Sequence, residues 1–248
     1  MTLTKAQLLG SQTAKSGFAN EQNIADKFNN WQQDDEAKKW LILMDYDLDE
    51  IDFVKAVVLH GHKTDVNVQI TIKLKEAIDV KNIQVKLVSN PKGFNQVDKR
   101  PVDRYNEFFG WKIPTDVVNI LKRFTGELSP TIPNPRDSRR MFIDEFLPSD
   151  QRKLFGWLNE NRTMIVNDVL RGRGEFTPEW VIVAQKVKND ARWILKNINE
   201  VINHYDGDII VSPQGSIKIG SILIQRKGGT PDPTSLQFKI NPTELFDL

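Results

Sequence analysis

Three residue types in one stretch of the chain can together bind a divalent metal and hydrolyse a phosphodiester. Asp65 is followed after eighteen residues by Gln84, and Lys86 comes two positions later, after Val85. Asp65 would supply an anionic oxygen ligand, while the Gln84 side chain and the Val85 carbonyl supply neutral oxygens that hard cations accept. Lys86 can orient or deprotonate an attacking water and stabilise charge on the phosphate. The stretch from Thr64 to Lys86 is therefore a candidate hydrolytic site.

Two neighbouring strands would place these side chains on one face of a sheet. From 66 to 75, apolar residues at even positions alternate with polar residues at odd positions, a pattern typical of a strand. Asp65 has the polar parity, and Gln84 and Lys86 share a face of the strand predicted over 82–87. The spacing resembles that of PD-(D/E)XK nucleases, with glutamine in place of the acid. From the residues alone, an exposed polar sheet face without catalytic role is the alternative.

The remaining elements would support this sheet. Glu21 lies in the first turn of a predicted helix, where a carboxylate ordinarily complements the helix dipole. That helix is predicted over 20–31. Further helices are predicted over 35–44, 102–111, 115–124, 138–146, 149–158 and 190–204, with 164–170 either helix or strand. Strands are predicted over 54–59, 179–187, 209–211, 216–226 and 235–240, and the break at Gly220-Ser221 is interpreted as a bulge.

Composition narrows the class of protein. The chain has 248 residues, 39% hydrophobic and 27% charged, which is enough to bury a substantial core. With no cysteine, disulfides and thiol chemistry are excluded, and three scattered histidines do not make a structural zinc site. No apolar run is long enough to span a membrane and no secretory signal is visible, so a cytoplasmic location is expected. Net charge is only +1, although basic residues cluster locally; charge alone favours scattered solvated side chains over one basic face.

Several blocks, in the same order, resemble the type II restriction endonucleases of the HinP type, which recognise GCGC. The blocks are residues 13–18, 20–21, 48–51, 55–59, 82–90, 93–96, 170–174, 197–200, 225–229 and 236–240. The family's active site is similar to Ser-Asp, eighteen residues, then Gln-X-Lys. Here Thr64-Asp65 is followed by Gln84-Val85-Lys86, so threonine keeps the hydroxyl and glutamine is the family's own pattern.

The resemblance implies an α/β fold of the PD-(D/E)XK, MspI-like type, with a mixed central β-sheet flanked by helices. A single domain is expected over 1–248, its catalytic part about 1–130 and its DNA-recognition part 131–248. Asp65, Gln84 and Lys86 would be catalytic, with Thr64 beside them. The metal would be Mg²⁺, with Mn²⁺ substituting, and its expected ligands are Asp65, Gln84, Val85 and the auxiliary carboxylate Glu21.

The expected partner is double-stranded DNA, cut at GCGC to leave 5′ overhangs by a monomer or a weak homodimer. A cognate DNA methyltransferase would be a genetic partner only, and no membrane is involved. Phe94, in a loop after the catalytic strand, would wedge between base pairs, unless it folds back into the core. The other candidate DNA contacts, to bases or phosphates, are Asn95, Gln96, Lys99, Arg171, Arg173, Arg226 and Lys227. Two alternatives stay open: a different short GC-rich target, and a DNA-binding protein that does not cut.

Overall fold

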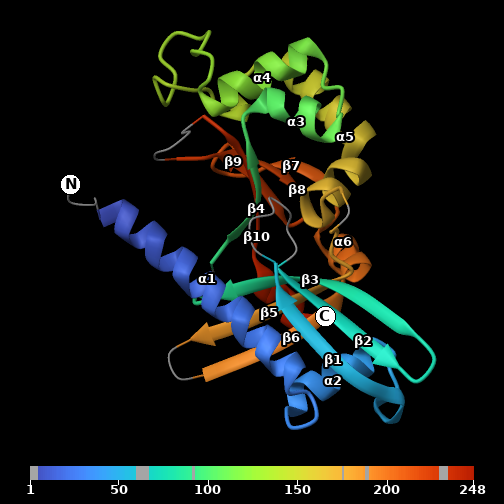
Figure 1. The fold of residues 1–248 in the computed structure, drawn as a ribbon. Helices are drawn as coiled ribbons and strands as arrows, with labels where there is room; N and C mark the ends of the chain where they lie inside the picture. The colour runs from blue at the N-terminus through green and yellow to red at the C-terminus, as the bar shows by residue number, and fades with distance from the viewer. Residues whose placement is uncertain (1–4, 60–66, 91–92, 175, 188–189, 229–233) are drawn as a thin grey trace. The chain divides into compact units, whose positions relative to one another are not determined.

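The chain forms two compact units, each built around a five-stranded sheet (Figure 1). The computed structural model describes residues 5–59, 67–90, 93–174, 176–187, 190–228 and 234–248. Unit 1 comprises Met1–Gly93, Gly174–Val201 and Pro242–Leu248, and unit 2 comprises Phe94–Arg173 and Ile202–Asn241. The predicted mixed α/β fold is confirmed, and strands of the C-terminal part form a second sheet.

The sheet of unit 1 is mixed. Its order is β1 (Ile51–Val58), β2 (Val68–Leu74), β3 (Ile78–Val88), β5 (Trp180–Val187) and β6 (Asp190–Asn197). Neighbouring strands are antiparallel except β3 and β5, which are parallel. Val68, Ile70 and Ile72 are fully buried. The alternation predicted over 66–75 is therefore confirmed where the strand is described.

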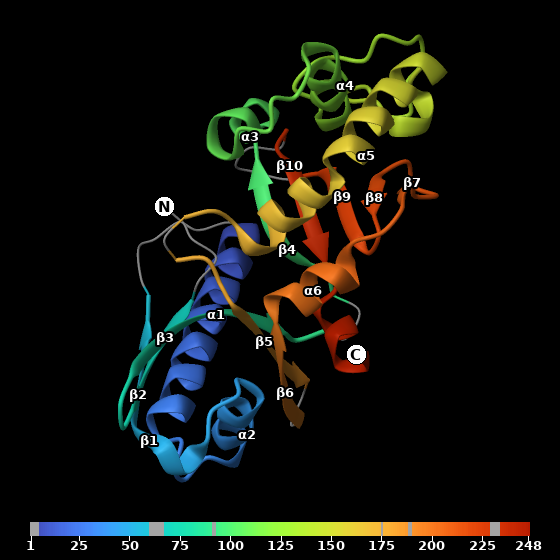
Figure 2. The same cartoon turned by 90° about the vertical axis from the view of Figure 1, so that its right-hand side faces the viewer.

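Helices cover the apolar face of this sheet. In α1 (Lys5–Asn29), Ile24 and Phe28 pack into one core with Val68 of β2 and Ile83 of β3. Figure 2 shows α1 lying across β1, β2 and β3. The side chain of Asp34 caps α2 (Asp35–Leu43) by accepting from the backbone amides of its first turn. The short 3-10 helices are η1 (Leu48–Glu50) and η3 (Pro242–Asp247).

Unit 2 has an antiparallel sheet with helices packed on it. The strand order is β4 (Asn95–Arg100), β10 (Leu236–Ile240), β9 (Ile222–Arg226), β8 (Ile217–Ile219) and β7 (Ile209–Val211). The helices are α3 (Val102–Phe109), α4 (Thr115–Thr125) and α5 (Pro148–Arg171), with the 3-10 turn η2 (Ile143–Glu145). Tyr105, Trp111 and Phe238 form an aromatic core between helices and sheet, with ring centroids 4.6 to 6.1 Å apart. No helix in the described ranges is long and apolar enough to cross a membrane.

Two predicted helices are wrong. Over 190–204 the chain forms β6, paired with β5 from Val187↔Asp190 to Trp180↔Asn197, and only α6 (Ile198–Tyr205) is helical. The apolar residues there fit both the helical and the strand period, and pairing with the buried strand β5 favours the strand. Over 138–146 the chain turns instead, because the Glu145 carboxylate accepts from the backbone amides of Arg136 and Phe142 and so competes with a helix.

The predicted bulge at Gly220-Ser221 is a two-residue hairpin turn. Ile219 pairs with Ile222, so these two residues form the whole connection between β8 and β9. Gly220 has φ +53°, which favours glycine. A Cβ there would meet the carbonyl oxygen of Tyr205 and lie 2.7 Å from the carbonyl carbon of Asp206.

Gly220→Ala should therefore destabilise the protein by about 2–3 kcal/mol, from positive φ and backbone collision together. Gly156→Ala is the matched control, because Gly156 is exposed within α5 and an added Cβ meets nothing within 4 Å. That change should stabilise by about 0.5–1 kcal/mol. Urea unfolding midpoints measure both, and equal midpoints for the two variants would contradict the turn geometry.

Candidate functional site

Asn67 lies where the pairing of β2 with β3 ends. Its backbone amide donates to the carbonyl of Ile83 over 3.1 Å, and its side-chain Oδ1 accepts from the backbone amide of Val85 over 2.9 Å. One residue therefore satisfies two successive backbone groups of β3. The second bond replaces a ladder bond with a side-chain oxygen, so Val85 keeps a partner at this point of the strand.

The same side chain brings Glu21 to this strand. Asn67 Nδ2 donates to Glu21 Oε1 over 2.9 Å, so both ends of the asparagine amide are used. Glu21 is partly buried in the interior of α1, which begins at Lys5, so its predicted place in the first turn of a helix is wrong. A predicted auxiliary carboxylate and the predicted carbonyl ligand Val85 are thus joined through a single residue between them.

Gln84 and Lys86 occupy alternate positions of β3, with Val181 and Val183 of β5 as their register partners. Gln84 is only 3% exposed and Lys86 is partly buried. An exposed polar sheet face, the alternative from sequence, is therefore wrong at Gln84. Because its side chain is buried, the Gln84 amide is held by the surrounding protein and is not solvated by bulk water.

Two buried amides of unit 1 have unpartnered side-chain atoms. The nitrogen of Gln84 and both side-chain polar atoms of Asn20 find no hydrogen-bond partner among the described residues. Each such group costs about 1–3 kcal/mol, and native proteins rarely leave one without a reason such as a bound water, ion or ligand. Asn20 precedes Glu21 and Gln84 precedes Val85, so the unpartnered amides flank the two residues that Asn67 joins.

The donors around β3 suit a hard divalent cation. Glu21 offers a carboxylate, Gln84 an amide oxygen, and Val85 a carbonyl that in an extended strand points to the same edge as its own amide, toward Asn67. Thr64 and Asp65 lie outside the described residues. Within the described ranges, no group of three or more histidine, aspartate and glutamate side chains is arranged to hold a metal. The fit therefore rests on mixed oxygen donors, as the sequence predicted.

In unit 2, three glutamines form a chain of hydrogen bonds across three strands. Gln225 Nε2 of β9 donates to Gln237 Oε1 of β10 over 3.3 Å, and Gln237 Nε2 donates to Gln96 Oε1 of β4 over 2.6 Å. Gln237 is 7% exposed, whereas Gln96 is exposed. This series of hydrogen bonds engages the side-chain oxygen of Gln96 and does not use its NH₂ group. Lys99 pairs with Gln237 in register and so stands on the same face.

Phe94 does not fold back into the core. Its side chain is 47% exposed, directly before β4, and Asn95 opens that strand. An aromatic residue this exposed is unfavourable in water unless it meets a partner.

The predicted basic contacts differ in how they are held. Arg173 donates two hydrogen bonds of 2.7 Å to the buried carboxylate of Asp168, which also accepts from Trp111. These bonds raise the pKa of Arg173 and anchor its charge. Arg226 Nη1 lies 3.8 Å from Asp137 Oδ2, and its side chain is 11% exposed. Arg171 ends α5, and Lys227 follows β9.

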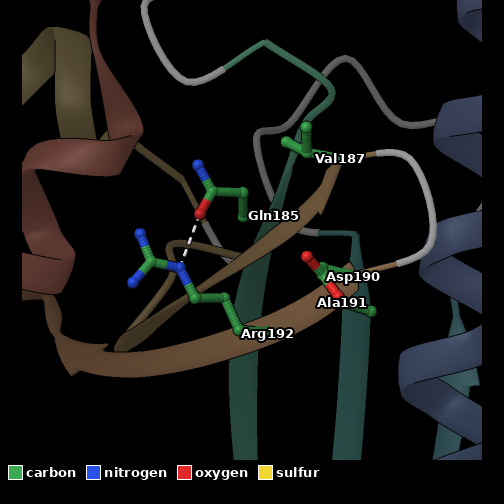
Figure 3. Close-up of a pocket in the computed structure, with 5 residues that line it drawn as sticks. All are labelled: Gln185, Val187, Asp190, Ala191 and Arg192. Atoms are coloured by element: carbon green, nitrogen blue, oxygen red, sulfur yellow. Dashed lines mark hydrogen bonds between the residues drawn. The ribbon is translucent and has the colours of Figure 1, made fainter.

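A pocket of about 430 Å³ lies beside the hairpin of β5 and β6 (Figure 3). The described residues that line it are Gln185, Val187, Asp190, Ala191 and Arg192. Arg192 Nε donates to Gln185 Oε1 over 2.5 Å, and the guanidinium stacks on Phe246 at 4.1 Å. None of these lining residues belongs to the predicted catalytic set, so the candidate site is the β3 edge.

Sequence reasoning missed Asn67 and Gln237. Asn67 was recognisable only as one of several polar residues on the odd face of its strand. Gln237 touches Gln96, which lies 141 positions away in sequence, so no local pattern connects them.

Comparison with known proteins gives one family and one fold. The model of the R.HinP1I restriction endonuclease family matches residues 44–246. No curated protein sequence matches the chain. The solved structure of restriction endonuclease MspI in complex with its cognate DNA is similar in fold, with a TM-score of 0.65 at 16% identity. That similarity covers 96% of this chain and 93% of the MspI chain.

Proposed function

The chain belongs to the R.HinP1I restriction endonuclease family and is a type II site-specific deoxyribonuclease, and from this premise we propose that it cuts double-stranded DNA at GCGC, leaving 5′ overhangs, with Mg²⁺ as cofactor. Mn²⁺ would substitute. The observation that carries the proposal is the convergence of Glu21 and Val85 on Asn67, beside the buried Gln84.

The β3 edge would supply most of the catalytic groups. Glu21, Gln84 and the Val85 carbonyl would hold the cation together with Asp65, and Thr64 would stand beside them. A divalent cation bound there supplies Lewis-acid stabilisation of the charge that develops on the scissile phosphate. Lys86 Nζ would orient the attacking water and take its proton.

Unit 2 and its polar face would contact the DNA. Phe94, exposed before β4, is suited to insert between base pairs. The NH₂ of Gln96 is a donor, which suits the acceptors O6 and N7 of guanine. The further contacts would come from Asn95, Lys99, Arg171, Arg173, Arg226 and Lys227.

We also propose a cellular location, an oligomeric state and a genetic partner for the enzyme. We place it in the cytoplasm, acting as a monomer on DNA or as a weak homodimer. A cognate DNA methyltransferase would protect the host's own sites without being a physical partner. Within one endonuclease domain we assign catalysis to about 1–130, which also carries the proposed DNA contacts of residues 94–99, and the remaining recognition to 131–248.

Digestion of a plasmid of known sequence tests the proposal directly. With Mg²⁺, fragment ends mapped by sequencing should fall at GCGC with 5′ extensions. Ends at another short GC-rich sequence would keep the enzyme and replace its target. Specific binding without cleavage in Mg²⁺ or Mn²⁺ would overturn the catalytic assignment.

Lys86→Ala should lower the cleavage rate roughly 10²–10⁴-fold, because the attacking water loses its proton acceptor. Specific DNA binding in Ca²⁺, measured by gel shift, should stay within about twofold. Lys73→Ala is the control, since Lys73 lies in the same sheet but pairs with Asp52. Cleavage that survives the Lys86 change would remove Lys86 from the site.

Gln237→Leu should weaken the distinction between cognate and altered sites by about tenfold, because Gln96 loses the bond that orients it. The ratio of cleavage rates on duplexes with a single base change measures this. Gln214→Ala, an exposed glutamine in a turn of the same unit, should leave the ratio unchanged. An unchanged ratio in the Gln237 variant would argue that Gln96 does not read a base.

Arg226→Ala should weaken cognate binding about 10–100-fold and non-specific binding much less. Lys227→Ala provides the neighbouring comparison, and binding is measured over a series of salt concentrations. Equal losses on both DNAs with a shallower salt dependence would mark Arg226 as a phosphate contact instead.

A further inference from the structure

Asn67 has a role that neither backbone pairing nor the catalytic assignment explains. Hydrogen bonding to Val85 alone needs only an acceptor. The amide also presents a donor to Glu21, a residue of a different element, 46 positions away in sequence. An asparagine that uses both ends in this way fixes the orientation of a carboxylate relative to a strand.

We propose that Asn67 is the positioning residue of the metal site: it holds the Glu21 carboxylate at the β3 edge so that Glu21, Gln84 and the Val85 carbonyl bind one divalent cation together. This inference rests on the proposed function, whose metal ligands it takes as given. Asn67 itself touches neither metal nor DNA in this scheme and acts through Glu21.

Charge and geometry make the support of Glu21 necessary. The other two proposed ligands, the Gln84 side chain and the Val85 carbonyl, are neutral, so Glu21 is the negatively charged group among these three donors. The hydrogen bond from Asn67 Nδ2 engages Oε1 of Glu21 and so restricts the rotation of the carboxylate relative to β3. The buried side-chain nitrogen of Gln84, itself one of the proposed ligands, has no partner among the described residues, and a water bound to the cation would give it one.

The sheet of unit 1 offers a matched control for Asn67. Gln69 of β2, two residues after Asn67 in sequence, also donates a hydrogen bond from its side-chain nitrogen to a residue of β3, here Asn82 Oδ1 at 3.0 Å. It has the same parity as Asn67 in the alternating segment, but its bond has no connection to Glu21 or Val85. A purely structural contribution of strand-to-strand amide bonds would make the two residues equivalent.

The test is direct binding of Mn²⁺ to the full-length protein, followed through the electron paramagnetic resonance signal of the free ion. Asn67→Ala should weaken Mn²⁺ binding about 10–100-fold, the usual effect of losing a residue that supports a metal ligand. Gln69→Ala should change it less than twofold. Asn67→Ser, whose short hydroxyl cannot reach both partners, gives the same test if Asn67→Ala does not fold.

A double-mutant cycle separates action through Glu21 from a general effect on β3. In the Glu21→Ala background, Asn67→Ala should weaken Mn²⁺ binding by no more than about twofold. A full loss in that background, or equal effects of Asn67→Ala and Gln69→Ala on the otherwise unchanged chain, would overturn the proposal.

Plasmid cleavage by the wild-type chain keeps the two claims apart. If the wild type cuts DNA in Mg²⁺ while Asn67→Ala binds Mn²⁺ normally, the positioning role fails and the nuclease function stands. If the wild type never cuts while its Mn²⁺ affinity depends on Asn67 through Glu21, the function fails and the metal site stands.

Discussion

A backbone amide at the end of a sheet pairing is the constraint on which the candidate site depends. Where β2 leaves β3, the Val85 amide needs a new acceptor, and the Asn67 side chain supplies it. The same side chain then fixes Glu21 of α1. The Asn67 side chain thus satisfies the backbone of β3 and holds the Glu21 carboxylate at the same time, so the position of a helical residue is tied to the register of two strands.

Unit 2 places its polar groups by a different means. Its glutamines form a chain in which each amide constrains the next, and its arginines lie against carboxylates, as Arg173 does with Asp168. Hydrogen bonding from Arg139 lowers the pKa of Asp137, so this acid stays charged beside Arg226. Side chains held in this way lose little freedom when a ligand arrives, which favours selectivity over adaptability.

Local patterns in the sequence predicted the strands and the faces on which their side chains lie. The alternation in β2 and the common face of Gln84 and Lys86 follow from period two, and both are present in the fold. The sequence did not predict strand β6, because the spacing of Trp193, Ile194 and Leu195 also suits a helix. Their backbone pairing with β5 makes this segment a strand. Asn67 and Gln237 act through partners distant in sequence, so tertiary structure alone gives them meaning. The assignment of Thr64 and Asp65 to the site rests on the resemblance of the sequence to the family's pattern.

The parallel pairing of β3 with β5 also determines when the site can exist. Gln84 lies beside Val181, so about 100 residues separate the two strands in the chain. The chain must therefore lose the entropy of closing a long loop before this pairing contributes any stabilisation. During synthesis the N-terminal hairpin can form early, but β3 lacks its second neighbour until β5 has left the ribosome. A nascent chain in which β5 has not yet been made therefore carries Gln84 and Lys86 at the edge of an incomplete sheet.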